Sequence, residues 1–236
     1  MDRRIILVTG ASKGIGHAAA LALANAGNHI IATARSEKAL TKLDDEIKTA
    51  TGHNATLIPL DLRDGAAIDR LASALLERFG RLDGLLGNAG VLGTIGPLEQ
   101  VTPAAFQETI DVNFTANWRL IRAVHPLLRV SEAGRALFMT SGVVPRPRAY
   151  WGIYGASKAA LETMIACYAD ETEKTPIRVN LFDPGATRTD MRFKAMPGED
   201  RSLLPPPEEV ASTIPQYLAA ECTLHGQRIA FAKRRA

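Results

Sequence analysis

The feature that most constrains the fold is an alternation of short apolar segments with longer amphipathic segments along the chain. The short segments are rich in Ile, Val and Leu, as strands buried on both faces are, and the longer ones place their apolar residues at helical spacing. This order predicts βαβ units that share one parallel sheet. The expected strands are 4–9, 29–33, 55–60, 82–88, 135–141, 177–182 and 227–231, and the expected helices are 14–26, 37–50, 65–79, 103–129, 154–173 and 207–220.

The alternation runs through all 236 residues without an internal repeat or a low-complexity linker, so we expect one domain over 1–236. The predicted fold class is α/β, with a doubly wound, seven-stranded parallel sheet and helices on both faces. The segment richest in proline and glycine is 194–209, "KAMPGEDRSLLPPPEE". Two interpretations of it stay open, a mobile lid over a site and a plain surface loop.

Composition and charge limit the classes of function. Apolar residues make up 46% of the chain and the formal net charge is only +3, with scattered basic residues, which does not predict a nucleic-acid-binding surface. No run of about 18 apolar residues predicts a membrane span, and the N-terminal apolar segment is too short for a signal sequence. Cys167 and Cys222 show no metal-binding or disulfide pattern. We expect a cytoplasmic protein with no metal, no nucleic acid and no membrane as partners.

A glycine-rich turn follows the first expected strand, in "TGASKGIG" at 9–16. Gly10, Gly14 and Gly16 permit a tight turn and a close approach of the backbone to a ligand. The helix that begins there presents free N–H groups and the positive end of its dipole, which favour a pyrophosphate. A strand, a glycine turn and a helix in this order predict a dinucleotide site in a Rossmann fold.

The end of the second expected strand bears on the choice of dinucleotide. An acidic residue there would bind the ribose 2′-hydroxyl of NAD, but this chain has Ala34 followed by Arg35. An arginine can hold the 2′-phosphate of NADP through two parallel hydrogen bonds, and Lys13 in the glycine turn would add a second positive charge. The sequence therefore favours NADP over NAD. The alternative is that both cations are solvated surface residues.

Tyr154 and Lys158, in "YGASK", are four residues apart and so share one face of an expected helix. Taken alone, such a pair is common on amphipathic helices. A nearby ammonium stabilises a phenolate and lowers the pKa of tyrosine from about 10, which makes the phenol a usable acid or base near neutral pH. Ser141, in "FMTSG", ends an expected strand, and Asn113, in "DVNF", lies in the helix before that strand. The carboxyl edge of a parallel sheet is where α/β enzymes place their chemistry.

Together these motifs resemble the classical short-chain dehydrogenases/reductases, whose glycine pattern is T-G-x-x-x-G-x-G and whose catalytic tetrad matches Asn113, Ser141, Tyr154 and Lys158. Within the family, the stretches "RIILVTGAS", "RLDGLLGNAG" and "PGATRTDMR" are similar to bacterial YciK-like oxidoreductases. The resemblance implies an NADP-dependent oxidoreductase that transfers a hydride between the nicotinamide and a carbonyl or secondary alcohol substrate. Tyr154 would be its general acid/base, Ser141 would hydrogen-bond the substrate oxygen, and Asn113 would hold a water connected to Lys158.

The resemblance also implies contacts along the cofactor. "DL" at 61–62 would border the adenine, "NAG" at 88–90 the adenine-ribose, and "PGATRT" at 184–189 the nicotinamide carboxamide. Asp61 has an alternative role as a helix cap, because "DLRDGAA" also reads as a helix start. The expected cofactor-binding residues are Gly10, Ser12, Lys13, Gly14, Ile15, Gly16, Arg35, Asp61, Leu62, Asn88, Ala89, Gly90, Tyr154, Lys158, Pro184, Gly185, Thr187 and Thr189.

Two further questions stay open at the level of sequence. Helices 103–129 and 154–173 carry apolar residues on more than one face, which in the family form a subunit interface, so we expect a homodimer or homotetramer. Simple core packing explains the same pattern. The second functional class is an NADP(H)-binding sensor or scaffold with incidental catalysis, because a fold alone does not establish a reaction. The complete tetrad favours the enzyme.

Overall fold

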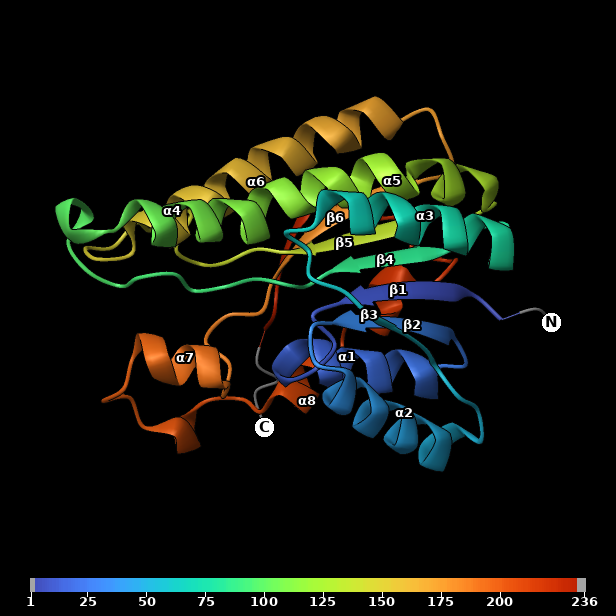
Figure 1. The fold of residues 1–236 in the computed structure, drawn as a ribbon, viewed down its shortest axis with the longest axis horizontal. Coiled ribbons are helices and arrows are strands. Elements are labelled where there is room, and N and C mark those ends of the chain that lie inside the picture. The colour runs from blue at the N-terminus through green and yellow to red at the C-terminus, as the bar shows by residue number, and fades with distance from the viewer. Residues whose placement is uncertain (1–2, 233–236) are drawn as a thin grey trace.

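A computed structural model describes residues 3–232 of the chain. Its centre is one seven-stranded sheet in the order β3-β2-β1-β4-β5-β6-β7, with every neighbouring pair parallel, as Figure 1 shows. This confirms the predicted Rossmann-type α/β fold. The strands are β1 (Ile5–Thr9), β2 (His29–Ala34), β3 (Thr56–Pro59), β4 (Gly84–Gly87), β5 (Arg135–Met139), β6 (Arg178–Asp183) and β7 (Arg228–Ala230).

Helices cover both faces of the sheet, because its strands are apolar on both sides. In Figure 1, α3 to α6 lie on one face, and α1, α2 and α8 lie on the other. Each face has its own buried cluster of aliphatic side chains between sheet and helices. The helices are α1 (Gly14–Asn25), α2 (Glu37–Thr51), α3 (Gly65–Phe79), α4 (Pro103–Ile110), α5 (Ala116–Val130), α6 (Gly152–Thr172), α7 (Asp190–Ala195), α8 (Pro207–Ala211) and α9 (Pro215–Leu218).

The structure differs from the sequence prediction in three helical regions. The helix expected at 103–129 is interrupted by a π-helical turn, Asp111–Thr115, between α4 and α5. The single helix expected at 207–220 is wrong, because the chain forms the short helices α8 and α9 there. Pro215 cannot continue α8, since it lacks the N–H for an intrahelical bond and its ring would clash with the preceding turn. The helix α7 was not predicted.

The order of the strands places the functional loops on one edge of the sheet. The chain leaves β1 toward α1 and β2 on one side, and enters β4 on the other side of β1. A cavity opens beside this reversal, at the carboxyl ends of the strands, where open α/β sheets bind ligands. Figure 1 shows α7 projecting beyond the same edge. Within residues 3–232, no helix combines the length and apolar character that crossing a membrane requires.

Candidate active site

The glycine turn after β1 is packed too closely for side chains. A Cβ added to Gly16 would lie 2.3 Å from both the amide nitrogen of Asn88 and the carbonyl oxygen of Gly10. A Cβ on Gly10 would lie 2.9 Å from the Cα of Ala89, and Gly10 also has a positive φ of 67°. The Asn88 amide donates to the carbonyl of Thr9 at 2.9 Å, which joins the β1 and β4 loops. The turn therefore presents backbone rather than side chains to the crevice.

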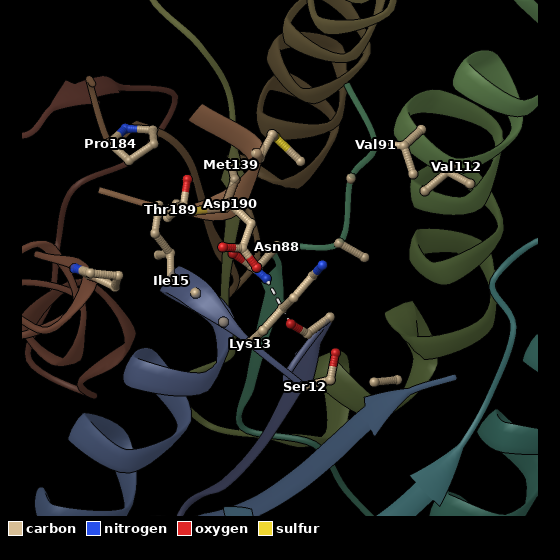
Figure 2. A pocket seen from close by; sticks show the side chains of 18 of the residues that line it. Ser12, Lys13, Ile15, Asn88, Val91, Val112, Met139, Pro184, Thr189 and Asp190 are labelled. Carbon is tan, nitrogen blue, oxygen red and sulfur yellow. Dashed lines mark hydrogen bonds between the residues drawn. The ribbon is translucent and has the colours of Figure 1, made fainter. Parts of the chain in front are cut away.

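The turn leads into α1, whose N-terminus faces a cavity of about 440 Å³. Lys13 is the N-cap residue, no side chain caps the helix, and its first turn has no acidic residue. The free N–H groups and the helix dipole therefore favour an anion at this position. Figure 2 shows Ser12 and Lys13 on this loop, with Val91 and Val112 together on another side of the cavity.

The far end of the cavity lies beyond β2 and β3. Arg35 is exposed there and lines the cavity. Asp61 lines it too, and its carboxylate accepts hydrogen bonds from Arg63, the shortest at 2.6 Å. This hydrogen bond holds the pKa of Asp61 below its usual value. The helix-cap alternative belongs to Asp64 instead, whose carboxylate accepts from the first turn of α3.

The Tyr154–Lys158 pair lies on α6, and both residues line the cavity and are buried. Burial lowers the pKa of Lys158 to about 8, and its Nζ donates to the carbonyl of Met139 at 2.8 Å. The pKa of Tyr154 is raised, chiefly by burial, while a hydrogen bond with Ser141 opposes the shift and the charge of Asp183 adds to it. The expectation of a lowered phenol pKa is therefore wrong for this structure. Desolvation outweighs every favourable contact of the phenolate.

The buried ammonium of Lys158 has a cost in stability, which gives a testable expectation. Because the folded pKa lies below the unfolded value of 10.5, the unfolded chain binds more protons between pH 8 and 10.5, so stability rises with pH across this window. We expect Lys158→Met to raise the free energy of unfolding at pH 7 by about 1 to 3 kcal/mol, with loss of activity. The gain should shrink by pH 10 in thermal unfolding scans. A lower Tm for the variant at both pH values would contradict it.

Asn113 is fully buried in the π-helical turn, and its amide is occupied by protein partners. Its Oδ1 accepts from the N–H of Val91 at 2.8 Å, and its Nδ2 donates to the carbonyl of Val91 at 2.9 Å and to Ser157 Oγ at 3.0 Å. The side chain thus joins the loop after β4 to α6. Its observed contacts hold that loop, and the water-holding role expected for its amide stays a prediction.

Ser141 lies two residues beyond the end of β5, half-buried beside Tyr154. The N–H of Val143 donates to its Oγ at 3.4 Å, and its main-chain carbonyl accepts from Arg228 at 3.1 Å. Ser141 and Asn113 do not contribute to the wall of the cavity itself. They flank Tyr154 and Lys158, which do.

The segment after β6 contributes part of its length to the cavity wall. Pro184 and Thr189 line the cavity, whereas Gly185 is exposed and Thr187 is buried with its hydroxyl donating to the carbonyl of Pro184 at 3.1 Å. Thr189 also caps α7, because its Oγ1 accepts from the N–H of Arg192 at 3.2 Å. This N-cap begins the helix that was not predicted.

The proline-rich segment 194–209 packs against α7. Arg192 makes two hydrogen bonds of 2.6 Å to the carboxylate of Glu199, and the guanidinium of Arg201 stacks 3.6 Å from the ring centre of Phe193. Arg201 also lines the cavity. The segment is therefore attached to the wall of the site by side-chain contacts, and both interpretations, a mobile lid and a plain surface loop, stay open.

Most of the expected cofactor-binding residues line this one cavity, and some residues that sequence reasoning missed line it as well. Most of the missed ones lie inside or directly beside a segment quoted above, such as Val91 after "NAG", Met139 in "FMTSG" and Arg188 in "PGATRT", so they had a local signal. The expected residues are Gly10, Ser12, Lys13, Gly14, Ile15, Gly16, Arg35, Asp61, Leu62, Asn88, Ala89, Gly90, Tyr154, Lys158, Pro184 and Thr189. The missed residues are Thr33, Ala34, Leu60, Val91, Val112, Met139, Thr140, Arg188, Asp190, Met191, Arg201 and Pro207.

Known proteins with similar sequences show which family the chain belongs to. The family model described as short chain dehydrogenase matches residues 4–200. The chain belongs to the short-chain dehydrogenase/reductase family. The oxidoreductase YciK of Escherichia coli K12 is 40% identical over 220 residues, which are 92% of this chain and 86% of YciK. This confirms the resemblance to YciK-like oxidoreductases, and the chain is an enzyme of this family.

Solved structures of this group align with nearly the whole chain. A short chain dehydrogenase from Shigella flexneri 2a, complexed with NADP, has a TM-score of 0.93 at 36% identity, over 98% of this chain and 97% of that chain. One from E. coli CFT073, complexed with NADPH, has a TM-score of 0.93 at 37% identity, over 98% and 97% of the two chains. Among residues 3–232 of the present protein, no group of three or more His, Cys, Asp or Glu side chains is placed to hold a metal ion.

Proposed function

We propose that this short-chain dehydrogenase/reductase is an NADP-dependent oxidoreductase that acts on a carbonyl or secondary alcohol substrate, with Tyr154 as general acid/base. One observation carries the proposal. Tyr154 and Lys158 line the same cavity as the glycine turn and the uncapped N-terminus of α1. A cavity that joins an anion-binding helix end to a tyrosine–lysine pair fits a dinucleotide and a reacting oxygen side by side.

The residues of the cavity fit NADP. Gly10 and Gly16 leave backbone where a Cβ would collide, so a pyrophosphate can approach the first turn of α1. Lys13 and Arg35 line the wall, and they would hold the 2′-phosphate. The positive charge of Arg35 also reaches Asp61 and helps to lower its pKa. Asp61, Asn88 and the 184–189 segment would supply the remaining contacts with the cofactor that the family resemblance implies. When bound, the nicotinamide supplies or accepts a hydride.

Side chains of the protein would transfer the proton that the substrate oxygen gains or loses. The Tyr154 hydroxyl would give its proton to the substrate oxygen in reduction and take it back in oxidation. Ser141 would donate a hydrogen bond to the same oxygen as charge develops, an effect on the order of 2 to 4 kcal/mol in comparable sites. Lys158 would stabilise the phenolate of Tyr154 from one helical turn away. Tyr154 and Lys158 are buried and Ser141 is half-buried, which limits competition from water.

The preference for NADP depends on Arg35, which gives a direct test. We expect Arg35→Asp to raise the Kd for NADPH by about 10- to 100-fold, because a charge-assisted contact to phosphate is replaced by repulsion. The Kd for NADH should stay the same or fall. Fluorescence titration measures both, with Arg70→Gln, an exposed cation on α3, as the matched control. Equal weakening for both nucleotides would contradict a specific role in phosphate recognition.

The remaining proposals concern assembly and location. A single domain over 1–236 is supported by the continuous sheet. Association through α5 and α6 into a homodimer or homotetramer is supported by Trp118, which is 46% exposed on α5, and sedimentation equilibrium tests it.

A cytoplasmic location is consistent with the free thiols of Cys167 and Cys222, and localisation of a tagged protein tests it.

A further inference from the structure

A cluster of charged side chains lies beside the catalytic helix, outside the expected tetrad. Arg228 on β7 donates through Nε to Glu162 of α6 at 2.9 Å, and one of its terminal nitrogens donates to Asp183, at the end of β6, at 3.0 Å. All three side chains are partly or largely shielded, with exposed fractions of 30%, 18% and 11% for Arg228, Glu162 and Asp183. We refer to these three residues as the Arg228 cluster.

The Arg228 cluster is bonded directly to the backbone that carries the site. The Arg228 nitrogen that reaches Asp183 also donates to the main-chain carbonyl of Ser141 at 3.1 Å. The hydroxyl of Thr140, the residue before Ser141, donates a hydrogen bond to Glu162. Two consecutive residues after β5 are thus held by the cluster, one through its backbone and one through its side chain. The position of Ser141 therefore depends on a strand, β7, that contributes nothing else to the expected tetrad.

The cluster also changes the electrostatics around Tyr154. The charge that acts on the phenol is that of Asp183 from β6. Lys158, on the same helix as Tyr154, and Asp190 of α7 line the same cavity as the phenol. The charge of Asp183 opposes ionisation of the phenol and adds to the rise in pKa that burial causes. Arg228 binds that carboxylate directly, so its positive charge reduces the negative potential at the phenol.

We propose that Arg228 and its two carboxylate partners are positioning residues for the reaction: they hold Ser141 and set the pH range in which Tyr154 exchanges its proton. This role rests on the function proposed above. A purely structural bridge between β6, β7 and α6 would make the same hydrogen bonds. It would not, however, shift the titration of Tyr154 in one direction when the positive charge is removed and in the other direction when the negative charge is removed. That difference in sign separates the two explanations.

The test compares Arg228→Gln, Arg228→Lys and Asp183→Asn with the wild type, and uses Arg178→Gln as a matched control at the other end of β6. The pH dependence of kcat/KM gives one readout. Titration of the Tyr154 phenol by absorbance, as the difference between each protein and its Tyr154→Phe form without any nucleotide, gives a second. Arg228→Gln should move both midpoints up by roughly 0.5 to 1 unit, and Asp183→Asn should move them down. Arg228→Lys should restore the wild-type midpoint, and Arg178→Gln should leave it unchanged.

The outcomes separate this inference from the proposed function. Shifts of opposite sign in Arg228→Gln and Asp183→Asn support the inference, whereas equal shifts, or unchanged midpoints with only a lower Tm, overturn it. If Tyr154→Phe keeps full turnover, the assignment of Tyr154 as acid/base fails, and with it the role of the cluster in the reaction. If Tyr154→Phe is inactive and the midpoints do not move, the proposed function stands and only the inference fails.

Discussion

Replacement of Tyr154 by phenylalanine is expected to lower kcat by about 10³-fold, because general acid–base catalysis by a positioned side chain contributes roughly 10²- to 10⁴-fold. The ring keeps its packing against Trp151, whose centroid lies 5.9 Å away, so the fold and the affinity for NADPH should be retained. The measurement is NADPH oxidation with a panel of ketones, aldehydes, quinones and β-keto thioesters, beside NADPH binding by fluorescence.

Tyr168→Phe is the matched control for this experiment. Tyr168 lies about four turns further along the same helix, its hydroxyl bonds His125 at 2.9 Å, and neither residue lines the cavity. The Tyr168→Phe variant lacks a tyrosine hydroxyl of α6 but keeps the expected site unchanged, so kcat should change by less than about twofold. Full turnover by Tyr154→Phe would disprove the acid/base role. A wild type that binds NADPH tightly but turns over nothing in the panel would favour the sensor or scaffold function instead.

Gly16→Ala is expected to weaken NADPH binding by about 100-fold or more and to lower the free energy of unfolding by roughly 1 to 3 kcal/mol. The new Cβ would lie 2.3 Å from the Asn88 amide nitrogen and from the Gly10 carbonyl oxygen. One of these contacts is with backbone, so the glycine turn must move to accept the methyl group. Such a movement displaces the N–H groups that the proposal assigns to the pyrophosphate.

Gly198→Ala provides the control for the methyl group itself. A Cβ at Gly198 would meet nothing within 4 Å, and its backbone does not require a positive φ. Its effect on stability should stay within about 0.5 kcal/mol, with an unchanged Kd. Isothermal titration and denaturant unfolding measure the two quantities. Tight NADPH binding by Gly16→Ala would contradict the assignment of this turn as the phosphate site.

The strands and the helix α6, which carries Tyr154 and Lys158, were predictable because they depend on local patterns. The run 5–8 is apolar and β-branched or aliphatic throughout, it is too short for a typical helix, and it is followed by a glycine turn, which together favour a buried strand. The positions of Tyr154 and Lys158 on one face follow from helix periodicity alone. The short helix α7 was missed because its six residues hold less than two turns, too few for periodicity to be recognised, and its Thr189 cap belonged to another motif.

The sequence by itself determined the order of strands and helices, the glycine turn, the tyrosine–lysine pair and the family to which the chain belongs. The tertiary structure decided what depends on distant segments: the raised pKa of Tyr154, the buried amide of Asn113 and the contact of Arg228 with Ser141. Spacing along a helix sets which side chains are neighbours, but desolvation depends on everything packed around them. A strand 87 residues away in sequence therefore reaches the active site without any local signal.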